Sequence, residues 1–371
     1  MERHFIKKII AILVLIAPIS VSFAIRASDD VDGLKGIQKA FNKVAEKTFP
    51  AVVVITTRKE LDQMGSPFMR YYQQQRGTHD FKAPVIEGKG SGFFVSEDGY
   101  VLTNYHVVRG NDEILVKMKN GEQYKGELIG TDPRTDLALL KIGPPGKVPF
   151  LEFADSEKVR IGDWAIAVGA PYNFDYTMTV GIVSQTGRSV GLNSYENYIQ
   201  TDASINRGNS GGPLLNIEGD VIGVNDFIFT DGYSTGNIGL GFAVPSNIAK
   251  DVAGQLEKNG KVVRPWIGIA MEELNSEMKK YFNAESGVLV REVFLANPAD
   301  KAGIEPGDVI VAVDGLEVKT PKELQSRIFS KQQGSEVLIK LIREGKKLDV
   351  TVYPKMVESH DDEAPDNAVS E

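Results

Sequence analysis

With 371 residues, the chain is long for one domain, and its 42% hydrophobic and 25% charged residues are typical of a soluble globular protein. The formal net charge of −8 argues against a nucleic-acid partner. The absence of cysteine excludes disulfides, thiol catalysis and cysteine-type zinc sites, and the presence of only four histidines argues against a multi-histidine metal site. We therefore expect two or three domains that use no metal and no cofactor.

The N-terminus has the pattern of an export signal. Basic residues within the first eight positions precede an uncharged apolar run from Ile9 to Ile25, and Ser22 and Ala24 have the small-residue spacing of a signal-peptidase site. The pattern predicts a signal peptide over residues 1–24 and a location in the periplasm. An uncleaved inner-membrane anchor facing the periplasm is the alternative, because seventeen uncharged residues are near the lower limit for spanning a bilayer.

The segment after the signal is predicted to contain a helix, a strand and a long loop in that order. Apolar residues with a helical period predict an amphipathic helix that ends near residue 48. The β-branched run Ala51–Thr57 predicts a buried strand. Residues 58–88 carry glutamines, charges, Gly and Pro without a period, which predicts a long loop.

From Gly88 onward, short apolar runs alternate with Gly and Asp/Asn turn signals, a pattern typical of an all-β barrel or sandwich. The predicted strands are 91–95, 113–117, 137–141, 164–168 and 221–225. A helical period over 246–258 then stops at Asn259 and Gly260, which predicts a helix end.

A second, smaller α+β domain is predicted over residues 263–355. Its strands are expected at 287–290, 308–313 and 336–340, and Thr320 and Pro321 begin a helix as cap and first-turn proline. Residues 358–371 are an acidic tail without core-forming residues and are expected to be disordered.

Three residues in separate segments have the types and the order of a catalytic triad. Each of His106 and Asp136 adjoins an apolar strand, and Ser210 lies in the glycine-rich run Asn-Arg-Gly-Asn-Ser-Gly-Gly. The order His, Asp, Ser, with separations of 30 (136 − 106) and 74 (210 − 136) residues, is the order of chymotrypsin-type enzymes. Taken alone, the histidine could be structural, the aspartate a turn residue or cap, and the glycine run a loop.

The chemistry of a serine nucleophile explains each residue type. A hydroxyl needs a base near neutral pH, which suits His106, and Asp136 would hold the other ring nitrogen and stabilise the imidazolium. The glycine-rich turn would present an oxyanion hole, formed by backbone N–H groups within Gly208, Asn209 and Ser210.

The runs GSGFFVSEDGYVLTNYHVV, DPRTDLALLKIG, AVGAPYNFDYTMTVGIVS, QTDASINRGNSGGPLLN and IGLGFAVPSN resemble the HtrA (Deg) family of serine proteases and cover nearly all of residues 34–258. The resemblance implies an all-β fold with a chymotrypsin-like pair of β-barrels and the active site between them. It also implies ATP-independent cleavage of unfolded or misfolded envelope proteins and assembly as a homotrimer or a multiple of it.

The resemblance also suggests where substrate specificity resides. In chymotrypsin-like folds the base of the primary pocket lies six residues before the nucleophile, here at Ser204, so a preference for Lys or Arg is disfavoured. The stretches that resemble the family's pocket favour small aliphatic residues, although two of these side chains, Asp226 and Phe227, are bulkier and more charged than the family leads us to expect. The predicted pocket consists of Ser204, Ile205, Asn225, Asp226, Phe227 and Ile228.

Residues 263–355 resemble a PDZ domain of the permuted bacterial type, on the runs RPWIGIA and GVLVREVFLANPADKAGIEPGDVIVAVDG and the helix from Pro321. In that family a turn binds a peptide's C-terminal carboxylate on backbone N–H groups, and the next strand pairs with the peptide. The resemblance implies a groove formed by Trp266, Ile267, Gly268, Ile269, Leu324 and Ile328. The alternative is that Leu324 and Ile328 are core residues only, and for Ile328 the two interpretations have equal weight.

Three functions follow as hypotheses. The first is an exported endoprotease for unfolded or misfolded proteins, whose PDZ domain binds C-terminal peptides for recruitment or activation; the loop at 58–88 favours this type. The second is a membrane-anchored regulatory protease that makes one site-specific cut in a stress-signalling protein. The third is a chaperone-like peptide-binding oligomer, which would need none of the triad residues.

Overall fold

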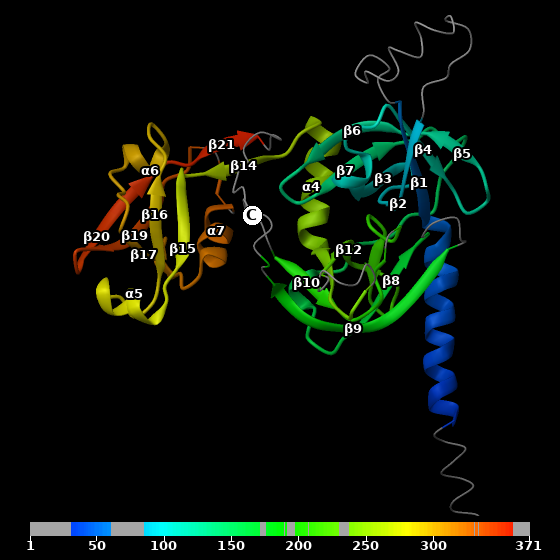
Figure 1. Ribbon diagram of the computed structural model, residues 1–371, viewed down its shortest axis with the longest axis horizontal. Coiled ribbons are helices and arrows are strands. Elements are labelled where there is room, and N and C mark those ends of the chain that lie inside the picture. The colour runs from blue at the N-terminus through cyan, green and yellow to red at the C-terminus, as the bar shows by residue number, and fades with distance from the viewer. Residues whose placement is uncertain are drawn as a thin grey trace, which may run out of the picture.

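The computed structural model of the chain describes residues 31–60, 85–170, 176–188, 190, 197–206, 208–229, 237–329, 331–332 and 334–358. A larger and a smaller body, both built mainly of strands, lie side by side and are joined by one narrow connection (Figure 1). The predicted signal peptide, the centre of the predicted loop and almost all of the predicted acidic tail lie outside the described residues.

The larger body begins with a helix over residues 31–48 and a 3-10 helix η1 (Phe49–Ala51), which lead into a seven-stranded antiparallel sheet. The strand order is β5-β4-β1-β2-β3-β7-β6. The short helix α3 (Tyr105–Val108) follows β3 directly. The strands of this sheet are β1 (Val52–Glu60), β2 (Val85–Phe94), β3 (Tyr100–Asn104), β4 (Glu113–Lys117), β5 (Gln123–Lys125), β6 (Glu127–Asp132) and β7 (Leu137–Lys141).

The second half of the larger body is a closed six-stranded barrel, reached through the 3-10 helix η2 (Ser156–Lys158). Its strands follow one another in the order β10-β13-β12-β11-β8-β9. The strands are β8 (Trp164–Gly169), β9 (Thr177–Arg188), β10 (Tyr198–Thr201), β11 (Pro213–Leu215), β12 (Val221–Ile228) and β13 (Gly241–Pro245).

Parts of the central strands are apolar at consecutive positions, and there both of their faces are buried. Successive side chains of a strand point to opposite faces. Phe94 packs into the core of the first sheet, while its neighbour Phe93 packs into a core shared by both halves. Likewise Ala167 packs inside the closed barrel and Val168 in the shared core. This shared core holds the two halves together.

Helix α4 (Ser246–Asn259) leaves the larger body and leads to the smaller one. Val252 and Leu256, one turn apart, are buried in the shared core. The helix ends at Gly260, whose φ of 71° is the left-handed conformation favoured at helix ends, and its N–H donates to the Leu256 carbonyl.

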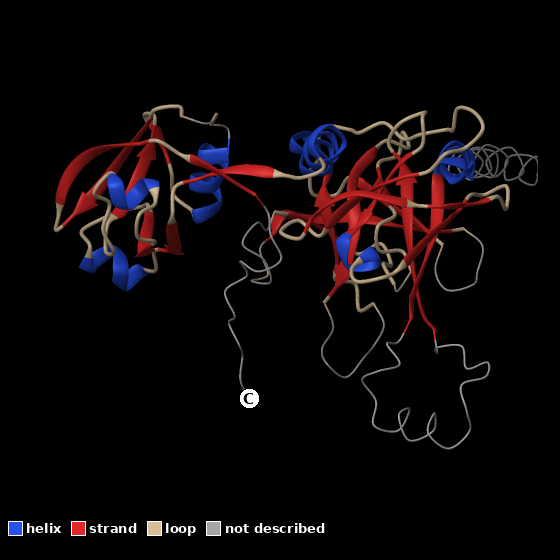
Figure 2. Cartoon of the chain, turned by 90° about the horizontal axis from the view of Figure 1, so that it is seen from above, coloured by secondary structure: helices blue, strands red, loops and turns tan. Residues whose placement is uncertain are grey.

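The smaller body is connected to the larger one by β14 (Val263–Trp266), which pairs with the last strand, β21 (Lys355–Glu358). Viewed from above, this two-stranded ribbon bridges the two bodies (Figure 2). The main sheet has the order β15-β16-β17-β19-β20, with β18 paired to β17, so β15 lies at its edge. The elements are β15 (Ile269–Glu273), α5 (Ser276–Tyr281), β16 (Val288–Val293), α6 (Pro298–Lys301), β17 (Val309–Val313), β18 (Leu316–Glu317), α7 (Pro321–Phe329), β19 (Val337–Arg343) and β20 (Lys346–Val352).

The all-β class with a smaller α+β domain is confirmed, and two details of the sequence prediction were wrong. Residues 58–60 and 85–88 are strand rather than loop, because β1 and β2 form a long antiparallel ladder in which Thr57 faces Gly88. The last strand, over 355–358, was not predicted and extends the smaller body beyond residue 355. None of the described helices has the length and apolar character needed to cross a bilayer.

Candidate active site

His106 and Asp136 are held together by two hydrogen bonds. The backbone N–H of His106, on α3, donates to Asp136 Oδ1 at 2.9 Å, and the ring atom Nδ1 bonds Asp136 Oδ2. The His106 side chain is 49% exposed and that of Asp136 is 16% exposed. With Nδ1 held by the carboxylate, Nε2 is the ring nitrogen left to exchange a proton with a substrate or a hydroxyl.

Asp136 adopts a backbone conformation that aspartate seldom takes. Its φ of 54° lies in the left-handed region. Its carbonyl accepts hydrogen bonds from the Tyr105 N–H and the Asn104 side-chain amide, both at 2.9 Å. Because these donors immediately precede His106, the same contacts fix the aspartate backbone and the start of the helix that carries the histidine.

The loop carrying Ser210 lies against the strands of the first sheet. The Ser210 carbonyl accepts from the Ser91 N–H at 2.9 Å, and the Gly211 N–H donates to the Asn225 carbonyl at 2.8 Å. Gly211 has a φ of 82°, and a Cβ there would collide with the Ser91 carbonyl and Thr103 Oγ1. A side chain at this position would therefore push the serine loop away from the strand that leads to His106.

Ser91 also fixes the peptide groups before Ser210. Its buried hydroxyl donates to the Gly208 carbonyl at 2.5 Å and accepts from the Ala170 N–H at 2.9 Å. Gly208 has a φ of 102°. Among the described residues, the N–H groups of Gly208 and Ser210 have no backbone acceptor, whereas the Asn209 N–H donates to the Asn206 carbonyl at 3.0 Å. Within the part of the chain that the structure describes, the N–H groups of Gly208 and of Ser210 itself are therefore available to receive a developing negative charge.

The residues predicted to form a substrate pocket lie around this loop but differ in burial. The Ser204 carbonyl accepts from Thr179 Oγ1 at 2.8 Å, and Ile205 is 1% exposed inside the closed barrel. Asn225 is fully buried, and its amide donates to the Val168 and Pro213 carbonyls. Their role as a substrate pocket stays a prediction.

The next three residues of β12 have different surroundings. Phe227 is half-buried and stacks on Phe242 with ring centroids 4.9 Å apart, and Ile228 is half-buried at the end of the strand. Asp226 is 4% exposed, and one of its carboxyl oxygens lies within 4.8 Å of an oxygen of Asp136 and a ring nitrogen of His106. Burial first, and the Asp136 carboxylate second, raise the pKa of Asp226 well above its usual range.

The residues predicted to form a peptide groove lie at the end of β14, in the turn before β15, at the start of edge strand β15 and on helix α7. The turn before β15 contains Gly268 with a φ of 86°, and the Ile267 carbonyl accepts from the Ala299 N–H at 2.7 Å. Leu324 and Ile328 of α7 are buried in the core with Ile269. Trp266 is half-buried and packs against Phe294 at 5.6 Å. Whether these residues bind a peptide stays a prediction.

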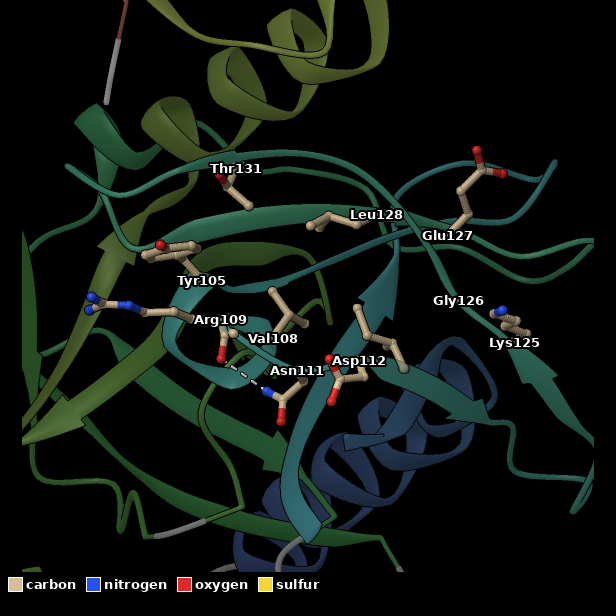
Figure 3. A pocket seen from close by; sticks show the side chains of 12 residues that line it. Tyr105, Val108, Arg109, Asn111, Asp112, Lys125, Gly126, Glu127, Leu128 and Thr131 are labelled. Atoms are coloured by element: carbon tan, nitrogen blue, oxygen red, sulfur yellow. Dashed lines mark hydrogen bonds between the residues drawn. The ribbon is translucent and has the colours of Figure 1, made fainter. Parts of the chain in front are cut away.

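A separate pocket of about 510 Å³ is lined by residues of α3 and by residues near β4, β5 and β6 (Figure 3). It is lined by Tyr105, Val108, Arg109, Gly110, Asn111, Asp112, Ile114, Lys125, Gly126, Glu127, Leu128 and Thr131. None of the predicted site residues lines it.

The sequence did not predict three polar residues that form hydrogen bonds near the site or between the two bodies. Ser91 lies between Gly90 and Gly92, where an added Cβ would collide with Val107 and Val101 respectively. The two glycines beside Ser91 were therefore the available sequence signal, because they indicate close packing. Asp132 and Arg264, which bond each other at 2.8 and 2.5 Å, had no signal, since they are 132 residues apart.

Comparison with known protein families assigns a family to each of the two bodies. The trypsin-like peptidase domain family matches residues 90–224, and the PDZ domain family matches residues 265–353. A probable periplasmic serine endoprotease DegP-like of Pseudomonas putida (strain W619) is 40% identical over 335 residues, which cover 84% of this chain and 69% of that protein. The protein of the same name in Chlamydia trachomatis serovar D is 40% identical over 355 residues, covering 89% and 71%.

Solved structures give the same result. The HtrA-type protease AlgW with decapeptide is 33% identical with a TM-score of 0.73, covering 85% of this chain and 98% of that one. The serine endoprotease from Yersinia pestis is 31% identical with a TM-score of 0.62, covering 85% and 98%. The chain therefore belongs to the HtrA (DegP-like) family of serine endoproteases, with a trypsin-like peptidase domain followed by a PDZ domain.

Proposed function

We propose that Ser210 is the nucleophile of this endoprotease, His106 its general base and acid, and Asp136 the group that orients His106. The observation that carries the proposal is the double hydrogen bond between His106 and Asp136, because it fixes the tautomer that leaves Nε2 free to take a proton. The Ser210 hydroxyl attacks the scissile carbonyl while His106 takes its proton, and the imidazolium then protonates the leaving amine.

The negative charge of the tetrahedral intermediate falls on the oxyanion hole, which we assign to the N–H groups of Gly208 and Ser210, with Asn209 completing the turn. Support comes from the Ser91 hydroxyl, which binds the Gly208 carbonyl. This bond and the one from the Asn209 N–H to the Asn206 carbonyl fix the Gly208–Asn209 peptide, which lies between the two assigned donors along the chain. Each such donor lowers the barrier by about 3 kcal/mol.

The substrates we propose are unfolded or misfolded polypeptides in the periplasm, cleaved without ATP. Relatives are named periplasmic serine endoproteases, and the chain shares their domain pair. We propose further that the PDZ domain binds exposed C-terminal peptides on β15, since this strand is at the sheet edge and, among the described strands, pairs only with β16. A structural neighbour contains a decapeptide, which supports peptide binding.

Assembly as a homotrimer, or a multiple of it, is part of the proposal. Exposed apolar side chains gather where the first helix meets β8: Phe41 packs on Trp164, and Ile37, Ile161 and Trp164 are 42%, 61% and 41% exposed. Such a patch is typical of an interface. Light scattering of the purified protein tests it, and a monomer at micromolar concentration would contradict it.

Cleavage of unfolded casein tests the proposed chemistry. Wild type is expected to cleave casein, and Ser210→Ala to lose this activity by a factor on the order of 10⁶. Ser276→Ala, an exposed serine of the PDZ domain, is the matched control and should cleave like wild type. A wild-type rate no higher than that of Ser210→Ala would contradict the proposal. N-terminal sequencing of the exported protein distinguishes a cleaved signal, with a start at Ile25 or later, from an anchor.

A further inference from the structure

Asp226 places a second carboxyl beside the proposed triad. It lies on β12 and is 4% exposed. One carboxyl oxygen of Asp226, one of Asp136 and a ring nitrogen of His106 all lie within 4.8 Å of one another. Asp226 therefore lies beside the His106–Asp136 pair, in addition to being a predicted residue of the substrate pocket.

Two carboxylates cannot both be charged in this setting without a countercharge. Both oxygens of Asp136 already bond His106, so Asp136 is placed to act as the acceptor in its contact with Asp226. Among the described side chains, no lysine or arginine forms an ion pair with Asp226. A hydrogen bond between two carboxyl oxygens requires one proton, so that proton belongs to Asp226.

We propose that Asp226 is a positioning residue, which stays protonated in the folded protein and donates an O–H···O hydrogen bond to the Asp136 carboxylate. The bond holds Asp136 toward His106 without removing the negative charge that the imidazolium needs. The inference rests on the proposed roles of His106, Asp136 and Ser210. Burial and the neighbouring carboxylate, which raise the pKa of Asp226, support the same assignment.

The arrangement makes activity sensitive to alkaline pH. When Asp226 loses its proton to solvent, the donor disappears and two negative charges face each other, so the geometry of the triad is lost. The titratable groups that face Asp226 are Asp136 and His106. The neighbouring strands β11 and β13 contain no ionisable residue, and the charged residues of α4 are exposed.

The pH profile of kcat/KM tests the proposal with two variants. Asp226→Asn keeps a donor but cannot titrate, so it is expected to retain activity within about threefold at neutral pH and to lack the alkaline fall of wild type. Asp226→Ala has no donor, and its kcat is expected to drop about tenfold at neutral pH with KM nearly unchanged. Asp251→Asn, an exposed aspartate on α4, is the matched control and should follow the wild-type profile.

An alkaline fall in Asp226→Asn equal to that of wild type would overturn the proposal. The profiles are also measured with EDTA, because a bound cation could neutralise the two carboxylates instead. Activity that is insensitive to EDTA supports the proton, whereas loss of wild-type activity in EDTA would overturn it.

A second measurement does not depend on activity. In the Ser210→Ala background, aspartate labelled with carbon-13 at the carboxyl should show one carboxyl that is still protonated at pH 7, and this signal should be absent from Ser210→Ala/Asp226→Asn. The absence of any protonated aspartate at pH 7 would overturn the proposal even if wild type cleaves casein. If casein cleavage fails instead, this signal still decides the state of Asp226.

The stability of the folded protein should also fall at alkaline pH because of Asp226. Because the folded pKa of Asp226 is raised, the folded protein binds a proton more tightly than the unfolded chain. Its contribution to stability is complete below the ordinary aspartate pKa and is lost as the pH rises through the folded pKa. Asp226→Asn should therefore gain in Tm over the parent protein as the pH increases, whereas a constant difference would overturn the proposal.

Discussion

Arg264 and Asp132 form a two-point ion pair between the two bodies of the protein. The Arg264 guanidinium donates to both Asp132 oxygens, at 2.8 and 2.5 Å, and the two side chains are 10% and 0% exposed. Arg264 lies on β14 of the PDZ ribbon, and Asp132 ends β6, four residues before Asp136. Thr135 adds a hydroxyl donor to Asp132. The position of the PDZ domain is thereby linked to the loop that carries the proposed triad aspartate.

Removing the arginine should destabilise the protein strongly. Arg264→Ala leaves the Asp132 carboxylate buried without this ion pair, which typically costs about 3–5 kcal/mol. Denaturant unfolding in the Ser210→Ala background, which prevents self-cleavage, measures the loss. Lys35→Ala is the control, because its pair with Asp32 is exposed and is worth less than about 1 kcal/mol. Equal losses of unfolding free energy in Arg264→Ala and Lys35→Ala would contradict the claim that the buried ion pair stabilises the protein more than the exposed one.

Ser91→Ala should lower kcat more than it changes KM. Without the hydroxyl, the Gly208 carbonyl and the Ala170 N–H lose their shared partner, so among the described residues the Gly208–Asn209 peptide is held only through its Asn209 N–H. Because oxyanion donors act mainly in the transition state, we expect kcat to fall about tenfold on a peptide substrate. Ser96→Ala, on the exposed turn after β2, should behave like wild type. A variant with wild-type kcat would show that the Ser91 hydroxyl does not support the loop.

Gly268→Ala should weaken peptide binding to the PDZ domain. The residue has a φ of 86°, and a Cβ there would collide with Asn297, so the turn must move. We expect affinity for a peptide with a free C-terminal carboxylate to fall at least about tenfold, and an amidated peptide to bind poorly even to wild type. Fluorescence anisotropy measures both.

Gly254→Ala is the matched substitution for this test, because a Cβ on that exposed face of α4 meets nothing within 4 Å. It should leave peptide affinity unchanged. Tight binding of the amidated peptide by wild type would contradict carboxylate recognition by this turn.

The sequence predicted the local parts of this molecule well and the long-range polar contacts poorly. Apolar runs bounded by turn residues indicated β4 and β7 at their observed bounds, because β7 is buried on both faces and the burial of β4 alternates, and both patterns have a strong local signal. The ribbon strand β21 has no such signal, since it is stabilised by pairing with β14 at the other end of the domain.

The same distinction holds at the site. The residue types of His106, Asp136 and Ser210 and their order along the chain are enough to indicate their chemistry. The contact between Asp226 and Asp136 depends on how β12 lies relative to the turn that directly precedes β7, and no sequence pattern spans the 90 residues (226 − 136) between them. For this reason Asp226 was predicted as a pocket residue only.

Covalent labelling of the serine tests the central claim most directly. A fluorophosphonate reacts with a serine only where a base activates the hydroxyl, so peptide mass spectrometry locates the nucleophile. We predict one adduct on Ser210 in wild type, none in Ser210→Ala, and labelling slowed by at least about a hundredfold in His106→Ala. An adduct on another serine, or equal labelling rates in wild type and His106→Ala, would contradict the assigned triad.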